Sequence, residues 1–230
     1  MHFNQLHKWD ISPSEAYKLQ NMLKRRIITK NTNKISLNKR LTVACVDVSY
    51  SRIEKVGFAD IIVWDTESKE IIEEQTAISE AMFPYIPGLL TFREAPLALS
   101  AISKLKSDID VFIFDGQGLA HPRNCGLASH LGLIINKPSI GCAKKRLIGS
   151  YSEPGAQKNS RSFLYNDQQI IGIVLRTKRR CNPLFISIGH MIDLELSVEI
   201  ILKLTDKYRI PEPLRIADIN TKILRKKHNL

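Results

Sequence analysis

The sequence has few of the features that mark secreted or membrane proteins. Its four cysteines, at positions 45, 125, 142 and 181, stand apart, and none forms the Cys-x-x-Cys pair of a zinc site or redox motif. No apolar run reaches the ~20 residues that cross a bilayer, and the opening residues MHFNQLHKWD lack the apolar core of a signal peptide. We therefore expect an intracellular, cytoplasmic protein with reduced thiols and no membrane partner.

The sequence also has fewer acidic residues than basic residues. The chain has 23 of them against 34 lysines and arginines, which gives a formal net charge of +11. A surplus of this size favours a polyanionic partner, nucleic acid ahead of an anionic membrane, although charge alone also allows a merely soluble basic protein. The 43% hydrophobic and 25% charged residues are typical of a globular protein. Because the 230 residues show no linker, repeat or low-complexity tract, the sequence predicts one domain, 1–230.

Hydrophobic periodicity predicts an α/β protein. Short polar turns join three strand-like segments near the start, which implies antiparallel neighbours, and helices then alternate with strands. The predicted strands are 41–50, 56–65, 70–78, 111–114, 139–143, a hairpin over 163–177 and 184–188; the predicted helices are 13–28, 91–106, 124–135, 194–208 and 214–227. This order predicts a mixed sheet, three antiparallel strands followed by parallel strands, with helices on both faces.

Two aspartates occupy positions where a carboxylate is costly. Asp47 interrupts an apolar run, and Asp115 ends the apolar strand 111–114 just before Gly-Gln-Gly. On adjacent strands the two would lie roughly 5 Å apart, the interstrand spacing. Their repulsion would be relieved by a cation, and Mg²⁺ prefers hard oxygen ligands of this kind. Taken singly, Asp47 could instead face solvent at a sheet edge, and Asp115 could merely begin a turn.

Further polar residues lie near these two acids in the sequence. Glu94 has capping-box spacing from Thr91, so it could be a capping residue alone. His121 follows Asp115 by six positions, and Lys144 begins a basic triplet after the next strand. A lone histidine is more often structural than catalytic, and a basic triplet is usually a solvated surface. None of these residues is decisive by itself.

The segment PYIPG at 84–88 is stiffened by its two prolines, which display the residues between them. Rigid side chains of this kind are inserted between bases when a protein distorts a duplex. An ordinary proline-rich loop packed on the core is the alternative.

Taken together, these segments resemble the endonuclease V family of deoxyinosine 3′-endonucleases. The resemblance spans about residues 5 to 228 in one order, with minor departures at Cys45 and Cys142. PYIPG followed by FRE and DGQGLAHPR is its most specific part. The matching stretches are VDVSY at 46–50, PYIPG at 84–88, FRE at 92–94, DGQGLAHPR at 115–123, GLASHLG at 126–132, IGCAKKRL at 140–147, RTK at 176–178, NPLFIS at 182–187, GH at 189–190 and IPEPLRIAD at 210–218.

The resemblance implies a ribonuclease-H-like fold and assigns roles to the matched residues. Asp47 and Asp115 would be direct ligands of Mg²⁺, which Mn²⁺ can replace, with Glu94 as a supporting acid and Asp218 as a more variable fourth member. Lys144 would face the scissile phosphate, and His121 would lie beside the metal. Tyr85 would be the wedge in the PYIPG segment. The lesion contacts would come from Pro84, Tyr85, Ile86, Pro87, Gly88, Leu90, Gly116 and Leu127.

The expected activity is therefore repair of deoxyinosine in DNA by a monomeric endonuclease that hydrolyses the second phosphodiester bond 3′ to the lesion. Inosine in RNA is an alternative substrate that the sequence does not exclude, and a binder of damaged or branched nucleic acid that does not cut is another. Two basic runs are predicted to contact the phosphate backbone and give salt-sensitive affinity: Arg176, Lys178, Arg179 and Arg180, and Lys222, Arg225, Lys226 and Lys227.

Overall fold

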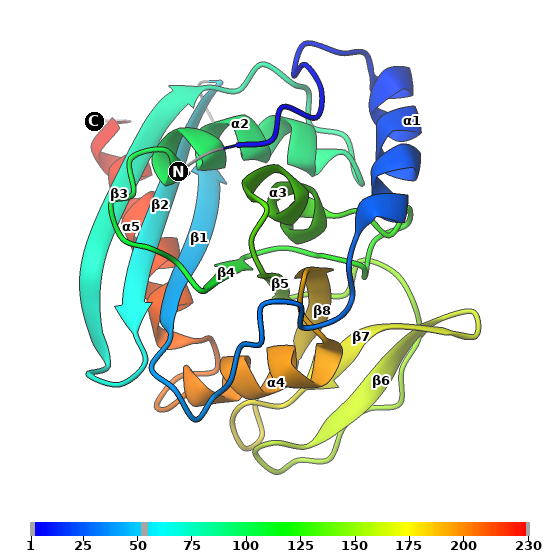
Figure 1. Ribbon diagram of the computed structural model, residues 1–230, viewed down its shortest axis with the longest axis vertical. Coiled ribbons are helices and arrows are strands. Elements are labelled where there is room, and N and C mark those ends of the chain that lie inside the picture. The colour runs from blue at the N-terminus through cyan, green and yellow to red at the C-terminus, as the bar shows by residue number, and fades with distance from the viewer. Residues whose placement is uncertain (1–2, 52–54, 229–230) are drawn as a thin grey trace.

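The computed structural model describes residues 3–51 and 55–228, and it is built around one mixed sheet (Figure 1). Eight strands lie in the order β3-β2-β1-β4-β5-β8-β7-β6. β1 pairs antiparallel with β2 and parallel with β4, which itself runs parallel to β5. The strands are β1 (Thr42–Tyr50), β2 (Val56–Asp65), β3 (Glu70–Glu80), β4 (Val111–Phe114), β5 (Ser139–Ala143), β6 (Arg161–Asn166), β7 (Gln169–Leu175) and β8 (Leu184–His190). The predicted mixed α/β sheet is confirmed.

Helices cover both faces of this sheet, as the sequence predicts. On one face, α2 and α3 pack against even-numbered residues of β1 and β4, such as Val46 and Phe112. On the other, α4 and the start of α5 pack against odd-numbered residues such as Cys45 and Ile113. The helices are α1 (Pro13–Leu23), followed by a short 3-10 turn (Lys24–Arg26), then α2 (Leu90–Ile102), α3 (Leu127–Ile135), α4 (Leu194–Lys203) and α5 (Glu212–His228).

The ends of several helices differ from prediction. Ser12 and Glu15 form the predicted capping box of α1, but the capping box expected from Thr91 and Glu94 is wrong. The residue before α2 is Leu89, and its side chain makes no capping hydrogen bond. Glu94 instead lies near the acids of the candidate active site. Among the described residues, no helix is long and apolar enough to cross a membrane.

Buried histidines give the fold a definite dependence on pH. Burial, together with a nearby positive or imidazole group, lowers the pKa of His121 and His190 to about 4 and that of His130 to about 3. His130 is fully buried, and its Nε2 lies 2.7 Å from Nε2 of His7. Below the ordinary histidine pKa of about 6.5, the unfolded chain binds protons that the folded chain does not.

We therefore expect these histidines to contribute stability that is fully present above about pH 6.5 and is lost as the pH drops toward 4, while the raised pKa values of the buried acids Asp47, Asp60 and Glu94 contribute in the opposite sense. Urea unfolding at several pH values measures this slope. His130→Phe keeps an aromatic ring beside Trp9 and Phe92, which surround His130, but cannot be protonated, so its slope should be shallower than that of the wild type. An unchanged slope in this variant would show that His130 does not supply the effect.

Candidate active site

Strand register brings the two predicted aspartates together. Val46 of β1 lies beside Phe114 of β4 in the parallel pairing, so the next residue on each strand, Asp47 and Asp115, falls at the same level. Cys45 and Ile113, two residues earlier, share one core cluster on the α5 side of the sheet. Because side chains alternate along a strand, both aspartates point to that side.

Helix α5 brings Asp218 to the same place. Each of Asp47, Asp115 and Asp218 offers one carboxylate oxygen, and the three oxygens all lie within 4.8 Å of one another. The buried Thr221, one turn further along α5, donates a hydrogen bond of 2.6 Å from its hydroxyl to Asp47. Two strands and one helix thus converge on a compact cluster of acids.

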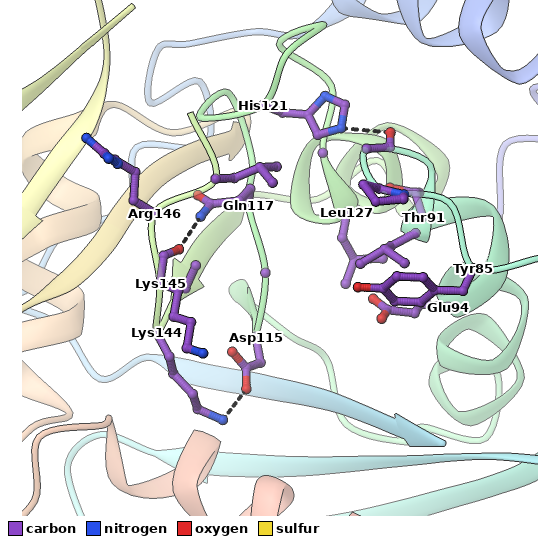
Figure 2. Close-up of a pocket in the computed structure, with 17 residues that line it drawn as sticks. Tyr85, Thr91, Glu94, Asp115, Gln117, His121, Leu127, Lys144, Lys145 and Arg146 are labelled. Atoms are coloured by element: carbon purple, nitrogen blue, oxygen red, sulfur yellow. Dashed lines mark hydrogen bonds and ion pairs between the residues drawn. The ribbon is translucent and has the colours of Figure 1, made fainter. Parts of the chain in front are cut away.

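Lys144 supplies the positive charge in this cluster. It follows β5, and its ammonium group donates to Asp115 (Figure 2) and, at 2.6 Å, to Asp218. Burial lowers the pKa of Lys144, but the carboxylates of Asp115 and Asp218 outweigh burial and raise it. Burial likewise opposes ionisation of Asp218, but the hydrogen bonds from Lys144 and Lys222 outweigh it and lower the pKa of Asp218.

The other two acids near the cluster, Asp47 and Glu94, behave differently. Burial, and then the negative charge of Asp115, raises the pKa of Asp47 to about 8. Burial, and then the charges of Asp47 and Asp115, raises the pKa of Glu94 to about 8 as well. The described cluster therefore holds more carboxylate than one ammonium group can neutralise. Its hard oxygen donors, brought together from separate elements, fit a divalent cation such as Mg²⁺.

A cavity of about 490 Å³ opens beside the acids. Its wall includes Glu94, Asp115 and Lys144, and Tyr85 lies at its edge, with the side chain 70% exposed (Figure 2). The predicted lesion residues that line it are Tyr85, Pro87, Gly88, Leu90, Gly116 and Leu127. The other two lie elsewhere: Pro84 borders a separate groove beside Trp9, and Ile86 packs toward helix α1.

Comparison with known proteins agrees with this geometry. The family model for endonuclease V matches residues 21–219. Endonuclease V of Kosmotoga olearia is 44% identical over 227 residues, covering 98% of this chain and 97% of that protein. The crystal structure of endonuclease V from Bacillus subtilis superposes with a TM-score of 0.94 at 35% identity, covering 100% of this chain and 99% of that one.

The chain belongs to the endonuclease V family. Its fold is accordingly ribonuclease-H-like, and the chain is a nuclease. A third relative was crystallised with nucleic acid: endonuclease V of Ciona intestinalis, in complex with a 24mer DNA containing an inosine followed by a ribo-adenosine. It is 26% identical, with a TM-score of 0.80, and the match covers 93% of this chain and 98% of that one.

The side chain of His121, which the resemblance places beside the metal, contacts the loop at 84–88. It lines the cavity of this endonuclease V but is only 4% exposed, and both ring nitrogens contact backbone atoms. Its Nε2 lies 2.9 Å from the carbonyl of Gly88, and its Nδ1 lies 3.2 Å from the amide of Arg123. Since a carbonyl can only accept, Nε2 carries the proton. His121 therefore holds the loop at 84–88 in place.

One basic run is corrected by the structure. Arg176 was predicted to contact nucleic acid, but it is 8% exposed. Its guanidinium donates to the carbonyls of Gly155, Pro154 and Cys181 and pairs with Glu153. The other predicted basic residues are exposed or half-buried, and three have protein partners: Lys178 donates to the carbonyl of Lys207, Lys222 pairs with Asp218, and Arg225 donates to the carbonyl of Tyr50.

Two residues of the site escaped sequence analysis. Thr221 fixes Asp47, and Gln20 of α1 bonds to the loops that surround the cavity. The position of Gln20 in the sequence does indicate that its side chain has buried partners. It lies on the same helical face as Ala16 and Leu23, which are buried, and a polar side chain within an apolar stripe needs partners.

Proposed function

We propose that this member of the endonuclease V family is a DNA-repair enzyme that recognises deoxyinosine and hydrolyses the second phosphodiester bond 3′ to it, leaving a 3′-OH and a 5′-phosphate. The observation that carries the proposal is the cluster of Asp47, Asp115 and Asp218 beside a cavity of about 490 Å³ with Tyr85 at its edge. The inosine-containing DNA bound by the Ciona relative supports the choice of lesion. The resemblance described above supplies the position of the cut.

Asp47, Asp115 and Asp218 would hold Mg²⁺ or Mn²⁺, with Glu94 as a supporting acid. The bound cation would supply Lewis acidity toward the phosphate and lower the pKa of a water molecule. Thr221 keeps the Asp47 carboxylate in position through its 2.6 Å hydrogen bond. Lys144 sits at the boundary between the acids and the cavity, where its fixed positive charge would stabilise negative charge that grows on the scissile phosphate.

The cavity would receive the extruded hypoxanthine. A base that pairs weakly costs less to unstack, which favours hypoxanthine over a normal base. Gly116 and Leu127 lie in contact on one wall of the cavity: a methyl group added at Gly116 would meet the Leu127 side chain at 3.3 Å. The backbone groups near Gly88, Leu90, Gly116 and Leu127 would contact O6 and N1–H of hypoxanthine, so that a normal base leaves buried polar groups unpaired.

The remaining partners follow from charge and composition. Lys178, Arg179, Arg180, Lys226 and Lys227 are exposed and would contact the DNA backbone. We further propose that the chain is one domain, acts as a monomer and works in the cytoplasm. The four free cysteines, three of them buried, support the last of these points.

The deciding experiment uses an end-labelled duplex that carries one deoxyinosine, incubated with Mg²⁺ and mapped for the position of the cut. We expect one nick on the lesion strand, between the first and second nucleotides on its 3′ side, lost with EDTA. Binding without a nick would indicate a module that holds damaged nucleic acid. Faster cutting of the matched inosine RNA would assign RNA as the main substrate, an outcome worth testing because the ligand of the Ciona relative contains a ribo-adenosine.

Replacement of the wedge gives a separate prediction. Because the Tyr85 side chain is 70% exposed, Tyr85→Ala should leave the unfolding midpoint nearly unchanged. Loss of a stacking ring worth about 1–3 kcal/mol should weaken binding to the lesion duplex by roughly 5- to 150-fold. Fluorescence anisotropy with lesion and undamaged duplexes measures the change. Met82→Ala, at an 88% exposed neighbour, is the control, and equal losses in the two variants would argue against a wedge.

A further inference from the structure

Helix α1 packs against the segments of the chain that form the cavity. It lies at the outer side of the molecule (Figure 1). Its buried residue Ala16 shares a core cluster with Phe83, Leu89 and Phe92, which flank or follow the wedge loop, residues 84–88. Leu23, at the other end of α1, packs with Cys125 and Leu133. The helix therefore supports the wedge loop from behind and reaches the segment that leads into α3.

The side-chain amide of Gln20 connects α1 to the wedge loop and to the segment before α3 through hydrogen bonds from its nitrogen and to its oxygen. It is fully buried at the centre of α1. Its Nε2 donates to the carbonyls of Gly88, at 3.2 Å, and Cys125, at 3.0 Å. Its Oε1 accepts from Nε of Arg123 at 2.6 Å. Both amide hydrogens and the oxygen are engaged, so the side chain is held in one orientation.

The Gly88 carbonyl is the point where these contacts meet. Besides Gln20, it accepts from Nη2 of Arg123 at 2.6 Å and from Nε2 of His121 at 2.9 Å. Gly88 has a left-handed backbone (φ +78°), and a methyl group added there would lie 2.7 Å from the Arg123 guanidinium. Three donors, one from α1 and two from the loop between β4 and α3, therefore fix the peptide that ends the wedge loop and begins one wall of the cavity.

Arg123 is itself held by α1 from a second direction. Its guanidinium lies over the ring of Tyr17, 4.4 Å from the ring centroid. A carbonyl with several donors, one of them charged, is more strongly fixed than a carbonyl with one neutral donor. Gln20 and Tyr17 thus set the position of Arg123, and Arg123 and Gln20 together set the position of Gly88.

We propose that Gln20 is a positioning residue for substrate selection: by fixing the Gly88 peptide, it sets the width of the lesion cavity and the placement of the wedge loop. The inference rests on the proposed function for its substrate, a deoxyinosine duplex. It assigns Gln20 no contact with the acids, so metal binding should be independent of it. The chemistry and the selection of the base would then depend on different residues.

Three variants test the proposal. Gln20→Leu removes all three hydrogen bonds at similar size. Gln20→Glu keeps an acceptor for Arg123 but places a carboxylate oxygen against the carbonyls of Gly88 and Cys125. Asn21→Leu is the matched control, because its exposed amide donates only within α1, to the Tyr17 carbonyl at 3.2 Å. Each is measured for Mn²⁺ affinity by calorimetry, for amide hydrogen exchange over residues 83–92, and for cutting of lesion and undamaged duplexes.

We expect both Gln20 variants to exchange faster over 83–92 and to lose roughly 10- to 100-fold in the ratio of lesion to undamaged cutting, the scale of a misplacement of about 1 Å. Mn²⁺ affinity and the values for Asn21→Leu should match the wild type. Unchanged exchange and unchanged selectivity in a folded Gln20→Leu would overturn the proposal, as would a loss confined to Mn²⁺ affinity. If the wild type itself fails to prefer the lesion, the proposed function fails, and hydrogen exchange still decides whether Gln20 holds the loop.

Discussion

Asp115→Asn should lower the rate of cutting by at least about a thousandfold, equivalent to roughly 4 kcal/mol. The change keeps the shape of the side chain but removes a charged oxygen from the group of three that lies within 4.8 Å. It also relieves repulsion, since the charge of Asp115 raises the pKa of Asp47. The folded variant should therefore be at least as stable as the wild type while binding Mn²⁺ more weakly.

Single-turnover cutting, Mn²⁺ calorimetry and thermal unfolding give these three values. Asp108→Asn provides the control, because Asp108 lies shortly before β4 on the surface, 93% exposed and paired with Lys137. It should cut at the wild-type rate. Near-normal turnover by Asp115→Asn would exclude the assignment of this acid to the metal, and an unfolded Asp115→Asn would contradict the expected relief of repulsion.

Lys144→Gln is expected to have the second largest effect. The ammonium group bridges Asp115 and Asp218, and its removal leaves Lys222, which pairs with Asp218 alone, as the remaining ammonium group in contact with these two acids. Without divalent cation, the variant should melt at a lower temperature than the wild type. With Mn²⁺, it should gain more stability than the wild type, because the cation meets stronger negative charge. Cutting should nevertheless fall about 10²- to 10³-fold, since a fixed charge near the phosphate is lost.

Lys145→Gln is the matched control for this experiment. Lys145 is exposed and lines the same cavity, and its backbone carbonyl accepts a hydrogen bond from the Gln117 side chain. Loss of its charge should weaken DNA binding slightly and leave the Mn²⁺ effect unchanged. Equal behaviour of the two lysine variants would mean that Lys144 acts only through the general positive charge of the surface.

Much of this site follows from the sequence because strands impose a strict alternation. Once Asp47 and Asp115 were recognised at equivalent places on two apolar strands, their meeting on one side of the sheet depended only on register, and the register is the one required. The resemblance added Asp218, which lies on helix α5. Nothing in the local pattern of α5 distinguishes this aspartate from the polar residues around it.

Other features depended on contacts that no local pattern contains. Arg176 looks like the first member of a surface run, but it directly follows the strand β7 and donates hydrogen bonds to carbonyls of the loop at 154–155. His121 reads as a catalytic group by its position in the motif, whereas its partners are backbone atoms of the wedge loop and of Arg123. In both cases the residue type was informative and its partner was not predictable.

Helix α1 contacts the loops around the cavity rather than the acids, and this affects how the substrate range of such an enzyme can diverge in evolution. The acids proposed to hold the cation come from β1, the end of β4 and α5, whereas the first helix supports, from behind, the cavity wall proposed to bind the base. On these proposals, a substitution in that helix changes which bases enter without altering hydrolysis. Related proteins could thus acquire a new lesion range through their amino-terminal segment while they keep the same cutting machinery.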